Sequence, residues 1–99
     1  MKTPQDEIDL AAAIAAAKSR YLKLCTGTMY MSYGESCMPA YADRCCALGA
    51  LKLAGINIRR LAYKRVLHGN DYPWLDWSRG DSDAGETLGY AFRLAMQED

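Results

Sequence analysis

The strongest pattern of apolar positions along the chain lies near its N-terminus. Apolar side chains recur there at intervals of three and four residues, at Ile8, Leu10, Ala11, Ile14, Ala15, Ala17, Tyr21, Leu22 and Leu24. This spacing places them on one broad face of an α-helix. Thr3 is a suitable N-cap, Pro4 suits the first helical position, and Gly27 is a suitable stop. The sequence therefore predicts a first helix that begins at Pro4 and ends before Gly27.

A second helical pattern occupies the middle of the chain. It is predicted to begin between Ser36 and Pro39 and to end at about Ala54, before the stop residue Gly55. Gly49 lies on this helix, and its lack of a side chain lets another backbone approach closely.

Two more helices are predicted in the C-terminal half. The third follows the N-cap residue Asn57 and ends at the stop signal of residues 69–70. The last begins at residues 82–83, where Asp83 and Glu86 have the spacing of a capping box. Its apolar stripe consists of Ala84, Leu88, Ala91, Phe92, Ala95 and Met96.

Residues 27–38 do not follow a helical pattern. Met29, Met31 and Tyr33 alternate with polar or less apolar positions, as in a short strand. No second segment alternates in the same way, so this one has no obvious partner. We interpret it as an ordered loop with at most one short extended segment near 28–33. The sequence as a whole predicts a mainly α fold, a compact bundle of about four helices in a single domain of residues 1–99.

Composition and charge narrow the class of protein. Hydrophobic residues make up 51% of the 99 residues, which is enough for one core and argues against disorder. The net charge is zero, unlike the strongly basic domains that bind nucleic acid. The distribution is uneven: residues 27–69 carry six basic and two acidic side chains, and residues 70–99 carry two basic and seven acidic ones. Such a distribution either steers a charged partner or is neutralised within the fold.

The sequence predicts a cytoplasmic protein, in a cell or in a cell that hosts a phage. Its first residues include carboxylates where a secretory signal would be basic, and the alanine-rich run is too short to span a membrane. The thiols are expected to be reduced in this compartment. They belong to Cys25, Cys37, Cys45 and Cys46.

Cysteine and histidine raise two chemical hypotheses. The cysteines and the single histidine, His68, lack the paired spacing of a structural zinc site, so no metal and no cofactor are expected. Cys37 is predicted near a helix N-terminus, where the helix dipole would favour a thiolate. With His68 as base and Asp71 or Asp76 as the orienting carboxylate, it would form a catalytic triad, but no local sequence signature supports that arrangement.

A basic segment and an aromatic segment are the other candidates for function. The predicted helix 58–68 carries Arg59, Arg60, Lys64 and Arg65 without an acidic residue, which suits an acidic protein surface or phosphates, or forms a solvated face. The connector that follows carries Tyr72, Trp74 and Trp77, which either anchor an interface or close the core.

A short string resembles a known family. Residues Cys45-Cys46-Ala47-Leu48-Gly49-Ala50-Leu51 resemble the Cys-x-Leu-Gly-Ala/Val core of a family of small uncharacterised phage and bacterial proteins. In that family a tryptophan or leucine and an Asn-Asp turn precede an amphipathic C-terminal helix. Trp77 and residues 83–96 occupy comparable places here, with Ser78-Arg79 at the turn. The resemblance covers residues 44–96 and implies a phage or mobile-element origin, a context that favours small accessory proteins acting on host machinery.

These observations together favour a non-enzymatic protein that binds a host protein or protein complex stoichiometrically, for example an anti-CRISPR or other anti-defence inhibitor. The predicted contact residues are Arg59, Arg60, Lys64, Arg65, Tyr72, Trp74 and Trp77. The alternatives are a cysteine-dependent hydrolase or transferase that uses Cys37 and His68, and a nucleic-acid-binding module that uses the basic helix 58–68. Homodimerisation through a helix face rich in small residues is compatible with each of them.

Overall fold

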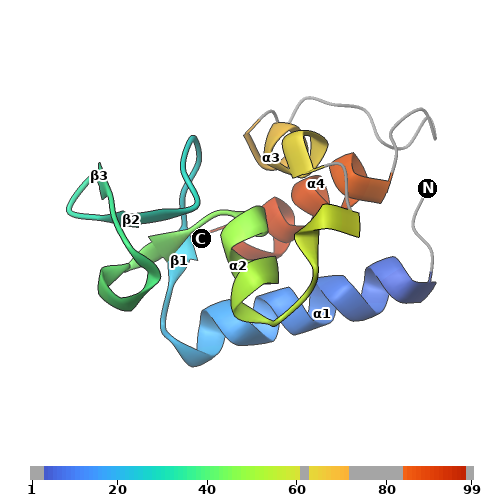
Figure 1. The fold of residues 1–99 in the computed structure, drawn as a ribbon, viewed down its shortest axis with the longest axis horizontal. Coiled ribbons are helices and arrows are strands. Elements are labelled where there is room, and N and C mark those ends of the chain that lie inside the picture. Colours follow the sequence, from blue (N-terminus) through green and yellow to red (C-terminus); the bar gives the residue numbers. More distant parts are fainter. Residues whose placement is uncertain (1–3, 61–62, 72–83, 98–99) are drawn as a thin grey trace.

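Helices and a small sheet occupy opposite ends of the molecule (Figure 1). The computed structural model describes residues 4–60, 63–71 and 84–97. Within them the chain forms, in order, helix α1 (Pro4–Ser19), strands β1 (Lys23–Leu24), β2 (Tyr30–Ser32) and β3 (Glu35–Ser36), the 3-10 helix η1 (Pro39–Tyr41), strand β4 (Arg44–Cys45), helix α2 (Ala47–Leu53), the 3-10 helix η2 (Ile58–Arg60), and helices α3 (Tyr63–Asp71) and α4 (Ala84–Met96).

The prediction of a mainly α bundle is wrong, because the described residues combine four α-helices with a four-stranded mixed sheet. The strand order is β1-β4-β2-β3; β1 pairs with β4 in parallel, and the other pairs are antiparallel. The alternating segment near 28–33 does supply a strand, β2. One of its partners, β4, comes from residues that the sequence assigned to the second helix. These residues form a strand because pairing with β1 and β2 provides hydrogen-bond partners for their backbone N–H and C=O groups on both sides.

The second helix therefore begins later than predicted. Residues 35–45 form β3, η1 and β4, and α2 begins at Ala47, with Cys46 as its extended N-cap. Gly49 behaves as expected: a Cβ atom there would lie 2.5 Å from the carbonyl oxygen of Met29. The backbone before β2 thus packs directly on α2, which joins the sheet to the helices.

The first helix ends earlier than predicted. Its last turn closes with hydrogen bonds from Leu22 N to Ala17 O and from Tyr21 N to Lys18 O, each 3.0 Å long. Tyr21 adopts a left-handed conformation with φ 57°, the conformation that ends many helices and in which glycine is usual. The chain then turns into β1, and Gly27 lies in the following loop instead of at a helix end.

The third helix is also divided differently. Residues 58–60 form η2, and α3 continues through Gly69 and Asn70 to Asp71, so the predicted stop signal lies inside the helix. The last helix, α4, begins within two residues of the predicted start, and Leu88, Phe92 and Met96 of its predicted stripe are buried.

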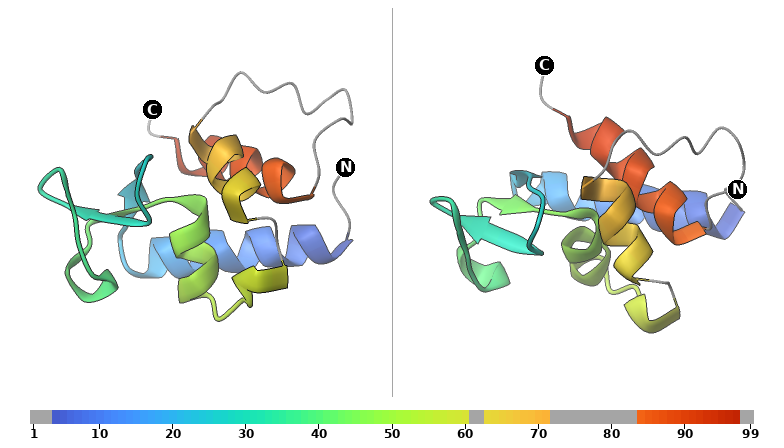
Figure 2. Two further views of the ribbon diagram at one scale, coloured as in Figure 1. Left: turned by 45° about the horizontal axis from the view of Figure 1, so that its top comes forward. Right: turned by 90° about the horizontal axis from the view of Figure 1, so that it is seen from above.

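The core lies where α1, α2 and α4 meet. Its largest fully buried side chains include Phe92, Leu88 and Val66, and α2 is buried from Ala47 to Leu51. Helices α3 and α4 lie side by side in every view (Figure 2). They can approach closely because Gly89 has no side chain. A Cβ atom at this position would collide with the backbone carbonyl of Val66. Within the described part of the chain, no helix combines the length and the apolar character that crossing a membrane requires.

Candidate binding pocket

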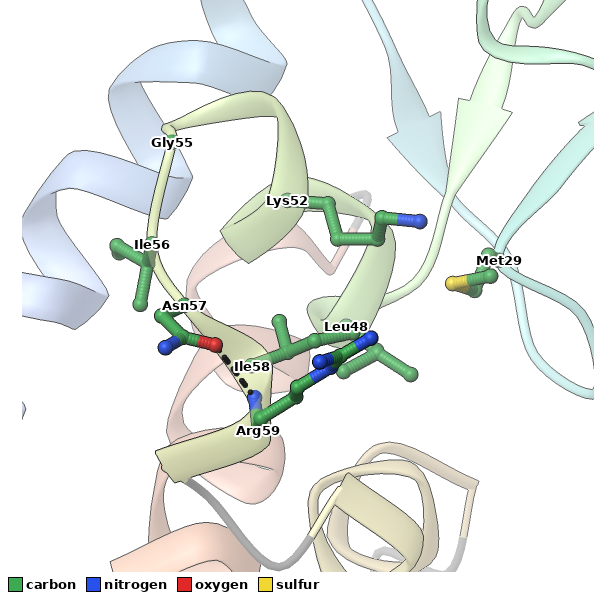
Figure 3. A pocket seen from close by; sticks show the side chains of 8 residues that line it. All are labelled: Met29, Leu48, Lys52, Gly55, Ile56, Asn57, Ile58 and Arg59. Atoms are coloured by element: carbon green, nitrogen blue, oxygen red, sulfur yellow. Dashed lines mark hydrogen bonds between the residues drawn. The ribbon is translucent and has the colours of Figure 1, made fainter.

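An open pocket of about 620 Å³ lies between α2, the segment that follows it and the residue before β2 (Figure 3). It is lined by Met29, Leu48, Lys52, Gly55, Ile56, Asn57, Ile58 and Arg59. Its volume falls in the usual range of ligand sites, ~300–1,000 Å³. We refer to it as the α2–η2 pocket.

The turn after α2 creates the pocket wall. Gly55 has φ 79°, a conformation that costs glycine little and other residues more. Hydrogen bonds from Gly55 N to Lys52 O and from Ile56 N to Leu51 O close the helix end and reverse the chain. The side-chain oxygen of Asn57 then accepts a hydrogen bond of 3.0 Å from the backbone N–H of Arg59, which fixes the start of η2. Ile58 and Arg59, the first two residues of η2, line the pocket opposite Leu48 and Lys52 of α2.

The pocket floor is apolar. Leu48 of α2 is buried, while Ile56, Ile58 and Met29 are half-buried around it. Met29 is held in place because its carbonyl accepts a 3.0 Å hydrogen bond from Cys46 N. Apolar surface left partly open to water gains free energy when a partner covers it.

The pocket rim is positively charged. Figure 3 shows Lys52 extending from α2 toward Met29, and Arg59 extending from η2 toward Leu48. Both side chains are exposed, and neither forms an ion pair with any residue that the structure describes. None of the lining residues that the structure describes carries a carboxylate. The pocket thus combines an apolar floor with two available cations, an arrangement that fits an apolar group flanked by negative charge.

Of the predicted contact residues, Arg59 lines this pocket. Arg60 follows it in η2, and Lys64 and Arg65 lie in the first turn of α3. The side chains of these three, and all of Tyr72, Trp74 and Trp77, lie outside the described residues. Of the predicted helix 58–68, residues 58–60 form the 3-10 helix η2 and residues 63–68 belong to α3, while residues 61–62 lie outside the described part of the chain. Sequence reasoning missed Lys52, since a single lysine on a helix carries no pattern that marks it.

A buried polar cluster connects three helices to the loop after β1. The side chain of Asn70 is fully buried; its Oδ1 accepts a hydrogen bond from Ala47 N at 3.0 Å, and its Nδ2 donates to Cys25 O at 3.1 Å. Its own carbonyl accepts a 2.8 Å hydrogen bond from the Arg93 guanidinium. Asp71 extends the cluster, because its Oδ1 accepts from Gly27 N at 3.2 Å. The sequence had marked Asn70 only as a stop signal, whereas its place in the structure is that of a core junction.

The cysteines are poorly placed for nucleophilic catalysis. Cys25, Cys45 and Cys46 are buried, and desolvation raises the pKa of Cys25 and of Cys45 to about 12 and raises that of Cys46 as well. A thiol with a raised pKa supplies little thiolate at neutral pH. All four cysteines are free thiols in the structure.

The predicted setting of Cys37 is wrong. It is half-buried and follows β3, and its N–H donates to Tyr30 O, so it does not stand at the start of an α-helix. The dipole argument for an activated thiolate therefore fails. His68 belongs to α3, which lies apart from β3 in Figures 1 and 2.

In the part of the chain that the structure describes, no three His, Cys, Asp or Glu side chains are grouped as metal ligands. Comparisons with family models, with curated proteins and with solved structures found no match for this chain. The site is therefore interpreted from its own geometry.

Proposed function

We propose that this chain is a small non-enzymatic binding protein that holds an acidic segment of a protein partner in the α2–η2 pocket. The observation that carries the proposal is the combination of an apolar floor with Lys52 and Arg59, which are exposed and form no ion pair with any residue that the structure describes. A segment with one apolar side chain and neighbouring carboxylates satisfies both features.

Each part of the pocket contributes differently to binding. Covering the apolar floor contributes about 25 cal/mol for each Å² removed from water. Pairing with Lys52 and Arg59 adds modest affinity, but it selects acidic partners and raises the rate of encounter. Arg59 also offers the planar fork that binds a carboxylate through two hydrogen bonds.

The basic character extends beyond the pocket, which favours a macromolecular partner over a small anion. Arg60 continues η2, and Lys64 and Arg65 follow at the start of α3. A small ligand would use the two rim cations, whereas a protein partner also offers a surface to the basic segment that follows them in the sequence. The burial of three of the four thiols also supports a binding role over a thiol-based reaction.

The resemblance of residues 44–96 to small phage and bacterial proteins directs the search for the partner. It supports a role as a stoichiometric inhibitor of a bacterial host complex, with defence systems of the CRISPR kind among the candidates. In that case the partner contributes the acidic segment and this chain blocks it.

The test compares affinity capture by the wild-type chain with capture by the double variant Lys52→Glu and Arg59→Glu, using lysate of the native host. We expect one partner in equimolar amount, captured at least about tenfold less by the variant, because two attractive contacts become repulsive. Capture should also weaken as salt concentration rises. The matched control is Lys18→Glu, which reverses an exposed cation on α1 outside the pocket. Equal capture by wild type and double variant would exclude the pocket as the binding site.

A further inference from the structure

Two exposed tyrosines adopt a backbone conformation that tyrosine disfavours. Tyr21 and Tyr33 have φ values of 57° and 53°, and their side chains are 91% and 96% exposed. Positive φ is uncommon for residues other than glycine, and for bulky side chains it is a true outlier. A side chain exposed to this degree packs on nothing that would offset the conformational penalty. The fold therefore gains nothing from having tyrosine at these two positions.

The positions themselves are ones where glycine or asparagine is usual. Tyr21 is the left-handed residue that ends α1, and Tyr33 is the first of the two residues, with Gly34, that join β2 to β3. Two-residue hairpin turns with positive φ at both positions favour Asn-Gly. Strain that the fold does not need is a mark of sites selected for function.

The sheet topology brings a third exposed tyrosine to the same edge. β1 and β4 are parallel, so the segments that lead into them start from one end of the sheet; Tyr21 lies two residues before β1, and Tyr41, the last residue of η1, lies three residues before β4. β2 is antiparallel to β4, so its last residue and the following Tyr33 reach that end as well. Tyr41 is 74% exposed. We refer to Tyr21, Tyr33 and Tyr41 as the tyrosine edge; Figures 1 and 2 show the β2–β3 turn and η1 at the sheet end of the molecule, the end toward which α1 runs.

Charges across the tyrosine edge are separated in a self-complementary way. Arg20 and Lys23 are exposed on the β1 side, which is one end of the strand order. Glu35 is exposed on β3, at the other end, and Asp43 lies between them, its carbonyl accepting a hydrogen bond from Lys23 N. A two-fold axis through the middle of such an edge places the cationic end of one copy opposite the carboxylate of the other.

We propose that the tyrosine edge is a homodimer interface, in which two copies of this chain pack Tyr21, Tyr33 and Tyr41 against one another around a two-fold axis. Tyrosine suits this role because it buries a large area with few rotatable bonds and keeps a polar hydroxyl for water or the partner. Lys23 of each copy then lies opposite Glu35 of the other. The inference does not depend on the α2–η2 pocket, which lies on other elements.

Sedimentation equilibrium of the full chain over a wide range of concentration tests the interface. We expect a reversible dimer. The double variant Tyr21→Gly and Tyr33→Gly should weaken association at least about tenfold, since interface tyrosines are frequent hot spots. Measured where both proteins are monomeric, its melting midpoint should equal or exceed that of the wild type, because glycine relieves both positive-φ positions. Ile8→Ser, at an exposed position on the far part of α1, should leave association unchanged.

Charge reversal tests the orientation of the two copies. Lys23→Glu and Glu35→Lys should each weaken the dimer by about fivefold or more, because two pairs become repulsive. An equimolar mixture of these two variants should associate again, since every contact then joins opposite charges. A wild-type chain that stays monomeric, glycine variants that dimerise normally or melt earlier, or a mixture that fails to associate would each overturn the proposal.

Discussion

The side-chain oxygen of Asn70, on α3, accepts a hydrogen bond from the backbone N–H of Ala47, the first residue of α2, at 3.0 Å. Helix N-termini leave backbone N–H groups without partners, and a buried one must be satisfied from elsewhere in the chain. Asn70 therefore acts as a cap delivered by a residue 23 positions further along the chain. The same amide group donates to Cys25 O, so one side chain joins α2 and the residue after β1 to α3.

Replacing Asn70 should be among the most destabilising single changes. Asn70→Ala removes the partners of Ala47 N and Cys25 O inside the core, at about 1–3 kcal/mol for each buried group left unpaired. We expect the free energy of unfolding, measured by urea denaturation, to fall by about 2–4 kcal/mol. Ser19→Ala, which removes an exposed hydroxyl bonded to the carbonyl of Ala16, should change it by less than about 0.5 kcal/mol. Similar small effects for both variants would contradict the role assigned to Asn70.

Gly89→Ala should destabilise the chain although alanine is the better helix former. On propensity alone the change would stabilise α4 by about 1 kcal/mol. The added methyl group, however, would meet the carbonyl of Val66 on α3, and backbone atoms cannot yield as a flexible side chain does. We expect a net loss of about 2 kcal/mol or more in thermal or urea unfolding. A gain in stability would show that α3 and α4 do not pack as closely as described.

The four thiols should differ sharply in reactivity. Cys25, Cys45 and Cys46 are buried and have raised pKa values, whereas Cys37 is half-buried. A disulfide reagent such as Ellman's reagent should modify one thiol quickly in the native protein, and all four after denaturation. Cys37→Ser should abolish the fast phase. Two or more fast thiols in the native wild type would contradict the burial of the other three.

Stability should decline in alkaline solution. The pKa of Cys25 and of Cys45 is raised from 9.0 to about 12 in the folded protein, so above pH 9 the unfolded chain loses protons that the folded chain keeps. The stabilisation from these protonated thiols is complete below pH 9 and is lost as the pH rises toward 12. The slope should be about 1 kcal/mol per pH unit for each thiol.

A cysteine variant provides the control for this decline. Cys45→Ala removes one of the two thiols, so its free energy of unfolding should fall less steeply between pH 9 and 11 than that of the wild type. Urea denaturation at several pH values measures both slopes. A free energy of unfolding that stays constant between pH 9 and 11 would contradict the raised pKa values of Cys25 and Cys45.

The parts of the fold that could be predicted are those fixed by local patterns. The start of α1 at Pro4 was predicted because proline suits the first position of a helix and a helical apolar pattern follows it. The helix α4 was predicted from the apolar stripe that includes Leu88 and Phe92. The close approach at Gly49 also followed from its lack of a side chain. In each case the informative residues lie within a few turns of one another, so a short window of sequence contains the signal.

The sheet could not be predicted, because its strands are too short to carry a pattern. β1, β3 and β4 contain two residues each, and β4 is defined by its pairing with β1 and β2 instead of by its own composition. The lack of a second alternating segment was therefore a misleading reason to exclude pairing. Tyr21 was assigned to the first helix because its spacing continues the apolar face. The structure shows that α1 ends at Ser19, before Tyr21.

The candidate site was predictable in part. Arg59 was among the expected contacts, because clustered charge is visible in sequence, and it does line the pocket. Lys52 and the apolar floor could not be found this way, since their proximity depends on the reversal at Gly55. The assignment of Cys37 to a helix start failed together with the second helix itself.

The position of β4 constrains the order in which the chain can assemble. Among the described residues it is the last strand to be synthesised, yet it lies between β1 and β2 and is the strand that joins them. On the ribosome, a nascent chain that ends before Arg44 holds a helix, a hairpin and a solitary strand with no ladder between them. The sheet can form only after residues 44–45 have been synthesised. The hydrogen bond that caps α2 requires Asn70, which is synthesised later still. Until β4 has formed, the edges of β1 and β2 that face each other lack the strand that joins them in the folded protein.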